Sequence, residues 1–264
     1  MKINNFVKVK NLEEAYNLLQ EDKDNAIVGG GAWLRLTNKN VKTLIDLEEC
    51  KLNEIKDGKD TLTIGAMVTL RDLETNESLQ KINDGILSNA IKGIMGVSIR
   101  NIATIGGSII GKYSFSDILT PLLVMDCSLE FYKTGTMTLK EFMKLKKVDD
   151  ILMNIIIKKT NNKGYFTAMK KTSLDFAVVN VAITKGESIS IAVGARPSVA
   201  LLQTEAMDFI NKEEVTLETI EKAASMISKN TKFGSNAKAS EEYRRSIVET
   251  FIKRGLKEVT QGWE

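Results

Sequence analysis

Apolar and polar positions follow two different periods along the chain. Leu12, Tyr16 and Leu19 are spaced four and three apart, which predicts a short helix with one apolar face. Apolar residues at helical spacing also predict helices over 78–95 and 117–125, and Thr69 is expected to cap a helix beginning at Leu70. Short apolar runs predict strands at 26–28, 43–47, 61–64, 128–133 and 151–159. Within the small, β-branched segment 101–110, residues 103–108 are expected to be a strand broken by two glycines.

The pattern changes after residues 161–164, whose sequence Asn-Asn-Lys-Gly is typical of a turn. Strand-like runs follow at 165–170, 176–184 and 188–193, and helical patterns follow near 199–210, 217–228 and 241–259. Strands followed by helices favour an α+β fold over alternating βαβ units. We therefore expect one domain over residues 1–160 and a second over 164–264.

Composition and charge exclude several classes of function. The chain has 264 residues, no histidine and two cysteines, Cys50 and Cys127. Histidine-based catalysis, iron–sulfur clusters and four-thiolate zinc sites are thereby excluded from this chain. A net charge of +3 gives no basic surface for nucleic acid, and no apolar run is long enough to span a membrane. We expect a cytoplasmic protein whose tryptophans, Trp33 and Trp263, serve packing.

Two glycine clusters follow apolar segments. Consecutive glycines at Gly29, Gly30 and Gly31 permit close backbone approach, and their N–H groups can form a nest for anionic oxygens. The alternative is a tight turn without a ligand. Gly106 and Gly107 form the second cluster, and two such clusters in one domain are able to face each other across a diphosphate.

Two neighbouring motifs leave alternatives open. Gly106 to Lys112 fits the start of a phosphate-binding P-loop, but Tyr113 stands where that motif requires Ser or Thr. Ten residues after the second cluster, Asp117 is a candidate acceptor of hydrogen bonds from ligand hydroxyls. The alternative is that Ser116 or Asp117 caps the next helix, and one residue is able to do both.

Several of these segments resemble one family. They are residues 27–34, 44–47, 64–70, 99–108 and 116–126, followed beyond the linker by 166–170, 176–179 and 193–197. In order and spacing they resemble the FAD-binding middle subunit of the molybdenum hydroxylases, such as xanthine dehydrogenase and carbon monoxide dehydrogenase. The resemblance covers nearly the whole chain.

This resemblance implies a PCMH-type FAD-binding fold of two α/β subdomains, with a boundary near residue 55. A C-terminal domain like that of the carbon monoxide dehydrogenase flavoprotein would close over the flavin. Both glycine loops would bind the FAD diphosphate through backbone amides, Asp117 would bond flavin-side hydroxyls, and Lys170 would lie near the isoalloxazine ring. The positions assigned to FAD in this way are Ile27, Val28, Gly29, Gly30, Gly31, Ala32, Trp33, Leu34, Ile94, Thr104, Ile105, Gly106, Gly107, Ser108, Asp117, Leu152 and Lys170.

The resemblance further implies an oxidoreductase subunit that is active within a complex. An iron–sulfur small subunit would deliver electrons from a molybdopterin large subunit, and FAD would pass them to NAD or another acceptor. No catalytic acid, base or metal ligand is expected in this chain. The sequence departs from the family at Gly31, Ala32 and Ser108, where polar residues or Asn are usual, and in the short stretch 132–150. These departures motivate an alternative, a non-catalytic assembly scaffold without functional flavin.

Overall fold

The computed structural model describes residues 1–261, so Trp263 lies outside the described residues. The chain forms two compact units, each built from separate stretches of sequence. Unit 1 contains Met1–Leu73, Gly96–Gly111 and Cys127–Lys158; unit 2 contains Glu74–Met95, Lys112–Asp126 and the chain from Lys159 on. Along the sequence, stretches of the two units alternate, whereas the two domains expected from the sequence follow one another. The division into domains at 1–160 and 164–264 stays a prediction.

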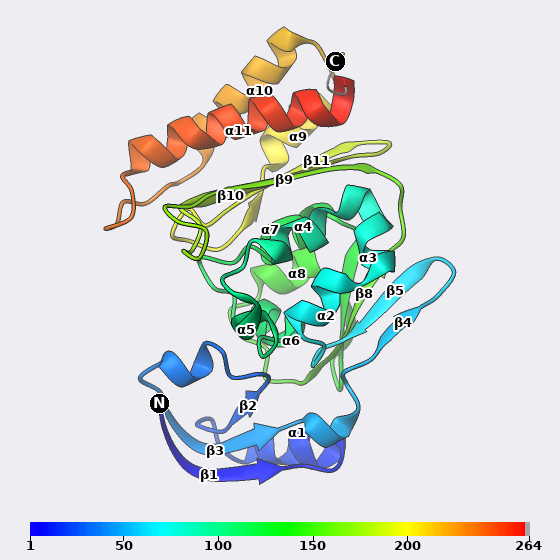
Figure 1. Ribbon diagram of the computed structural model, residues 1–264, viewed down its shortest axis with the longest axis vertical. Coiled ribbons are helices and arrows are strands. Elements are labelled where there is room, and N and C mark those ends of the chain that lie inside the picture. The colour runs from blue at the N-terminus through cyan, green and yellow to red at the C-terminus, as the bar shows by residue number, and fades with distance from the viewer. Residues whose placement is uncertain (262–264) are drawn as a thin grey trace. The chain divides into compact units, whose positions relative to one another are not determined.

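Unit 1 begins with a small parallel sheet in the order β1-β3-β2. Its elements are β1 (Lys2–Lys8), α1 (Leu12–Glu21), β2 (Ala26–Val28) and β3 (Asn40–Asp46). Asn11 starts α1 because its side chain accepts a hydrogen bond from the N–H of Glu14 at 2.9 Å. Ala15 of α1 and Ile45 of β3 are fully buried in one apolar cluster, which holds the helix on the sheet (Figure 1). The sheet thereby fixes the point where β2 ends and the first glycine cluster begins.

A second sheet of unit 1 has five antiparallel strands in the order β4-β5-β8-β6-β7. They are β4 (Ile55–Asp57), β5 (Thr61–Gly65), β6 (Cys127–Phe131), β7 (Gly135–Thr138) and β8 (Leu152–Lys158), accompanied by η1 (Leu34–Leu36), η2 (Glu48–Cys50), α5 (Val97–Arg100), α6 (Ile105–Ile110) and α8 (Leu139–Lys144). Thr138 and Glu141 form a capping box that starts α8. Helix α2 (Leu70–Thr75) follows Thr69, whose hydroxyl accepts from the N–H of Asp72 at 3.1 Å, which confirms the predicted cap.

The short stretch 132–150 is closed by one buried carboxylate. Asp150 accepts hydrogen bonds from the N–H groups of Thr134 and Ile151, both at 2.7 Å, and from the Thr134 hydroxyl at 2.6 Å. The N–H of Lys133 donates to the same carboxylate at 3.1 Å. A segment that contains only β7 and α8 is therefore anchored at both ends by a single side chain.

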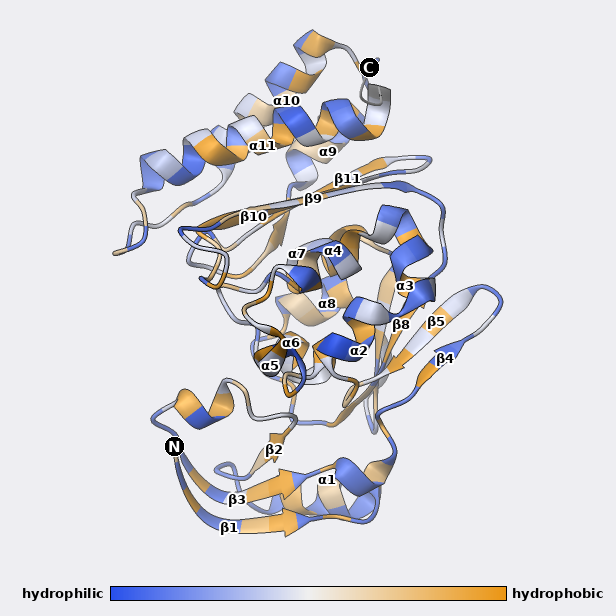
Figure 2. Ribbon diagram, in the orientation of Figure 1, coloured by the Kyte–Doolittle hydropathy of each residue, from blue (hydrophilic) through white to orange (hydrophobic). Residues whose placement is uncertain are grey.

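Unit 2 contains a four-stranded antiparallel sheet in the order β12-β11-β10-β9. Its strands are β9 (Lys163–Met169), β10 (Val179–Lys185), β11 (Ile189–Gly194) and β12 (Leu201–Leu202), and its helical segments are α3 (Glu77–Lys81), η3 (Ile82–Gly85), α4 (Ile86–Lys92), α7 (Leu119–Val124), α9 (Thr204–Ile210), α10 (Leu217–Asn230) and α11 (Glu241–Gln261). Helices α9, α10 and α11 lie on one side of the sheet, and α4 and α7 lie on the other (Figure 1). Strand β10 is consequently buried on both faces, and hydrophobic residues recur along α11 where it meets the sheet (Figure 2).

Two predicted elements are wrong. Residues 78–95 are not one helix, because Asn83, Asp84 and Gly85 adopt left-handed backbone angles with φ of 50°, 54° and 70°. The break is fixed by a tertiary contact, since buried Asn83 accepts from the hydroxyl of Thr160 and donates its own N–H to the Thr160 carbonyl. Residues 103–108 are not a strand, because Thr104 caps helix α6 through the N–H of Gly107.

Other predicted boundaries shift by a few residues. Strand β9 begins at Lys163 inside the expected linker, β10 begins only at Val179, and α9 begins at Thr204 after β12. Among the described residues, no helix combines the length and the apolar character needed to cross a membrane.

We expect Asp150→Ala to destabilise unit 1. The substitution leaves the N–H groups of Lys133, Thr134 and Ile151 without their acceptor, which costs about 2–3 kcal/mol in the free energy of unfolding. Urea denaturation of the purified chain measures this loss. Asp149→Ala is the matched control, because its exposed carboxylate pairs with exposed Lys147. Equal stability of the two variants would contradict the anchoring role of Asp150.

Candidate functional site

The first glycine loop of unit 1 packs directly against residues 102–104. A Cβ on Gly29 would overlap the Thr104 hydroxyl, and a Cβ on Gly30 would overlap the Ile102 carbonyl. Gly31 has φ of +66°, in the left-handed region that glycine adopts without strain. The two glycine clusters predicted from the sequence are therefore neighbours in the fold, as a shared ligand requires.

Most backbone N–H groups of the second glycine cluster already donate hydrogen bonds to acceptors within unit 1. The N–H groups of Ile105, Gly106 and Ser108 donate to the carbonyls of Val68, Ala66 and Thr104 at 3.0, 2.9 and 3.0 Å. The N–H of Gly107 makes a longer bond of 3.3 Å to the Thr104 hydroxyl. Gly106 is needed here for close packing, because an added Cβ would lie 2.7 Å from the Ala66 carbonyl oxygen.

The first cluster has its donors free. In the part of the chain that the structure describes, the N–H groups of Gly29, Gly30, Gly31 and Ala32 make no hydrogen bond. Consecutive free N–H groups next to a left-handed residue are the components of an anion-binding nest. The geometry therefore favours this loop over α6 as the main source of backbone donors for an anion.

The remaining predicted positions of unit 1 support these loops. Ile27 and Val28 end β2, and Ile27 packs into the apolar cluster beneath α1, while Trp33 and Leu34 lead into η1. Leu152 is buried where β8 begins, opposite Phe131. The next carbonyl, that of Met153, accepts from Ala66 at 2.8 Å, and Ala66 in turn accepts from Gly106. Leu152 is thus linked to the second cluster through backbone hydrogen bonds.

Unit 2 brings together three other predicted residues. The Asp117 carboxylate lies 2.8 Å from the Lys170 ammonium, with side chains only 5% and 12% exposed. Lys170 also donates to the carbonyl of Gly93 at 2.6 Å, which places it beside Ile94. The capping alternative is wrong for Asp117, because α7 has Ile118 as its N-cap residue; the Ser116 hydroxyl accepts from the N–H groups of Ile118 and Leu119, both at 3.2 Å. Asp117 is left to bind Lys170.

Sequence reasoning missed a buried asparagine at this cluster. Asn180 of β10 is fully buried, and its amide nitrogen donates to Asp117 Oδ1 at 2.5 Å. The hydroxyl of Thr120 donates to Asn180 Oδ1 at 2.7 Å. An asparagine in the apolar run Val-Val-Asn-Val-Ala-Ile was the available signal, because a polar residue on a buried strand needs a partner.

The P-loop alternative finds no support in this geometry. Gly106 and Gly107 lie inside α6, where a P-loop would have an open loop, and the N–H of Gly106 already donates to the Ala66 carbonyl at 2.9 Å. Burial lowers the pKa of the Lys112 ammonium and raises the pKa of the Tyr113 phenol. Tyr113 stacks on Phe115 with ring centroids 5.2 Å apart, so it serves packing where a P-loop would hold Mg²⁺.

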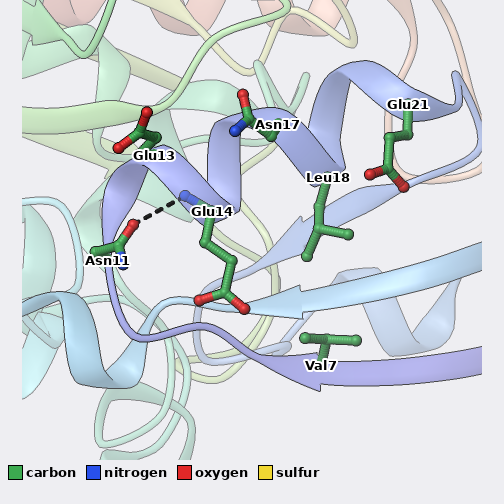
Figure 3. A pocket seen from close by; sticks show the side chains of 7 residues that line it. All are labelled: Val7, Asn11, Glu13, Glu14, Asn17, Leu18 and Glu21. Carbon is green, nitrogen blue, oxygen red and sulfur yellow. Dashed lines mark hydrogen bonds between the residues drawn. The ribbon is translucent and has the colours of Figure 1, made fainter.

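A separate hollow of about 480 Å³ lies beside α1 and β1 (Figure 3). Three of its lining residues are glutamates, Glu13, Glu14 and Glu21, and Asn11 in its wall is used as the cap of α1 (Figure 3). Among the described residues, no group of three or more metal-ligating side chains converges. The carboxylates would repel a diphosphate, so this hollow is unrelated to the glycine loops.

Two family descriptions match this chain. The FAD binding domain in molybdopterin dehydrogenase matches residues 1–160, and the CO dehydrogenase flavoprotein C-terminal domain matches residues 164–259. The nicotine 6-hydroxylase medium subunit of Paenarthrobacter nicotinovorans is 25% identical over 274 residues and covers 96% of each chain. The glyceraldehyde dehydrogenase medium chain of Sulfolobus acidocaldarius is 23% identical over 274 residues and covers 96% of this chain and 97% of its own.

Solved structures share the fold. A chain of quinoline 2-oxidoreductase from Pseudomonas putida 86 superposes with a TM-score of 0.87 at 22% identity, covering 99% of this chain and 98% of that one. A chain of carbon monoxide dehydrogenase from Hydrogenophaga pseudoflava gives a TM-score of 0.89 at 21% identity, covering 98% and 97%. The predicted α+β flavoprotein fold, a PCMH-type part followed by a C-terminal flavoprotein part, is confirmed.

Because the two glycine loops are in contact, substitutions at the neighbouring residues Gly30 and Gly31 should affect backbone hydrogen exchange differently. Gly30→Ala would push the first loop away from Ile102, so backbone hydrogen exchange should accelerate in both loops. Gly31→Ala is the control, because its Cβ meets only Val28 at 3.5 Å and its strain of about 1–2 kcal/mol stays in the first loop. Hydrogen–deuterium exchange with peptide resolution measures both effects. Unchanged exchange at residues 101–108 in Gly30→Ala would refute the contact.

Proposed function

The chain belongs to the FAD-binding subunits of the molybdenum hydroxylases, and from this premise we infer that it is an electron-transfer subunit with FAD as its redox group. The observation that carries the proposal is the first glycine loop, which packs against Ile102 and Thr104 and has four N–H groups without a partner among the described residues.

The residues of unit 1 fit the diphosphate of FAD. Gly29, Gly30, Gly31 and Ala32 supply backbone donors, and the absence of side chains at the glycines leaves the backbone open to phosphate oxygens. Gly107, whose N–H makes only a long hydrogen bond, is the best-placed donor of the second cluster. FAD supplies the redox chemistry, and the protein supplies binding, orientation and charge.

In unit 2, Asp117 is suited to bind the hydroxyls of FAD, and Lys170 is suited to lie beside its ring. An ionised carboxylate has about four acceptor sites, so Asp117 retains acceptor capacity beyond its bonds from Lys170 and Asn180. The Lys170 ammonium has three donors, of which two are used by Asp117 and Gly93 within the described residues. We assign Asp117 to the hydroxyls and Lys170 to the ring of FAD, where its positive charge favours negative charge on the ligand.

The proposed place of the chain is in a multi-subunit complex. Its two cysteines are too few for an iron–sulfur cluster, which takes four ligands. We propose that an iron–sulfur subunit delivers electrons originating at a molybdopterin subunit, and that NAD or another acceptor receives them. Relatives named as medium subunits or medium chains support this assignment.

One structural observation favours the scaffold alternative. The stretch 132–150 is short and closed by Asp150, so it offers little loop that is free to contact a flavin. A scaffold would keep the fold without a redox-active flavin. The unused donors of the first glycine loop favour the FAD-binding function over this alternative.

FAD binding should depend on the absence of a side chain at Gly107. A Cβ there meets only Thr104 Oγ1 at 3.1 Å, so Gly107→Ala should fold while it obstructs phosphate approach. We expect about one FAD per wild-type chain by absorbance, and binding weakened by about 1–3 kcal/mol in the variant. Gly135→Ala is the control, because its Cβ meets nothing within 4 Å while its φ of +79° strains the backbone, so it shows whether strain in unit 1 alone weakens FAD binding.

A colourless wild-type chain that does not take up added FAD would refute the proposal. Full affinity in Gly107→Ala would instead place the diphosphate on the first loop alone. A bound flavin that neither NADH nor the co-purified partner subunits can reduce would favour the scaffold.

A further inference from the structure

The two buried polar residues of β10 each hold one end of the segment that contains α7. Asn180 donates to Asp117 and to the Ser116 carbonyl, ahead of the helix, at 2.5 and 3.1 Å. The hydroxyl of Thr184, on the same strand, donates to the carbonyl of Val124 at 2.8 Å, where the helix ends. Of these two attachments, the one through Asn180 includes a hydrogen bond to the Asp117–Lys170 pair, and the one through Thr184 does not.

The orientation of the Asn180 amide is fixed by its partners. Its nitrogen donates to two acceptors, the Ser116 carbonyl and the Asp117 carboxylate, while its oxygen accepts from the Thr120 hydroxyl. A flipped amide would place its oxygen against two other acceptors, which burial makes costly. The side chain therefore has a single favourable orientation, with the donor toward Asp117.

The fold makes room for this network at a third position. Gly194 of β11 lies opposite Asn180 in the sheet, and an added Cβ would overlap both the Thr120 hydroxyl and the Asn180 amide oxygen. Glycine at this position thus allows the Thr120–Asn180 hydrogen bond to form between the sheet and α7.

Lys170 depends on Asp117 for its position. A lysine side chain is long and flexible, and the ammonium of Lys170 is held by one carboxylate and one carbonyl, those of Asp117 and Gly93. Of these two, only the carboxylate carries a charge, and its other oxygen is the one bonded to Asn180. Movement of the carboxylate would release the ammonium.

We propose that Asn180 is a positioning residue that holds the Asp117 carboxylate, and through it the Lys170 ammonium, in place for the flavin. The inference rests on the proposed function for its flavin, but the positioning itself is a property of unit 2. Thr120 orients the Asn180 amide, and Gly194 provides the space for it.

The reactivity of Lys170 tests the positioning without any flavin. Asn180→Leu keeps a similar volume and removes both donors, so acylation of Lys170 by acetic anhydride should become about tenfold faster, the fold-change that corresponds to one hydrogen bond to a charged group. Peptide mass spectrometry of the full chain measures the rate, with exposed Lys171 as the internal reference.

Thr184→Val is the matched control. It removes one buried hydrogen bond from the same strand to the same segment, so it should lower stability while leaving Lys170 protected. Equal acylation rates in wild type and Asn180→Leu would overturn the proposal, as would an equal acceleration in Thr184→Val. If Asn180→Leu does not fold, Thr120→Val takes its place, because it frees the amide to rotate and should also expose Lys170.

The midpoint potential of bound FAD tests the consequence for the flavin. With the ammonium released, negative charge on the ring is less stabilised, so the potential should fall in Asn180→Leu and stay at the wild-type value in Thr184→Val. An unchanged potential in Asn180→Leu would overturn the link to the flavin. A wild-type chain without FAD would refute the proposed function, whereas the acylation rates would still decide the role of Asn180.

Discussion

The structure depends on one close backbone contact, between Gly29–Gly30 and residues 102–104 of unit 1. No side chain fits between the two segments, so the sequence must place glycines where β2 ends. The contact brings the end of a parallel sheet next to the start of α6, and it leaves a row of N–H groups unpaired within the described residues. Backbone donors without protein partners require water or a ligand. The N–H groups of this loop are therefore open to water or to a ligand.

Helices and strands were predicted correctly from the sequence where the local apolar pattern and the tertiary packing favour the same structure. The helix at Leu12 and the strand at residues 61–64 have clear apolar periods, and both formed close to the expected bounds. Residues 101–110 are rich in β-branched and small side chains, yet the Thr104 cap and close packing of Gly106 on Ala66 make the second half of the segment helical. The break within 78–95 is imposed by Thr160, a residue far along the chain, which no local period can indicate.

The sequence indicated candidate residues for the site, but it did not indicate the hydrogen bonds that these residues make. The glycine pairs, Asp117 and Lys170 stand out by motif, and the structure places the loops together and the charged pair together, each within its unit. Which N–H groups are occupied follows from partners such as Val68 and Ala66, which the motif does not contain. The asparagine at position 180 signalled that a buried partner exists, but an isolated polar residue in an apolar strand does not indicate that this partner is Asp117.

Stability alone does not explain the polar cluster of unit 2. A buried ion pair gains little over apolar residues of similar volume, since desolvation opposes the Coulomb attraction. The Asp117–Lys170 pair nevertheless has a supporting amide, a hydroxyl that orients this amide and a glycine that leaves space for both. At the other end of the α7 segment, the attachment to β10 is a hydrogen bond from the Thr184 hydroxyl to the Val124 carbonyl. The additional polar groups at Asp117 therefore serve the position of a charge, which is the property that a redox cofactor requires of its surroundings.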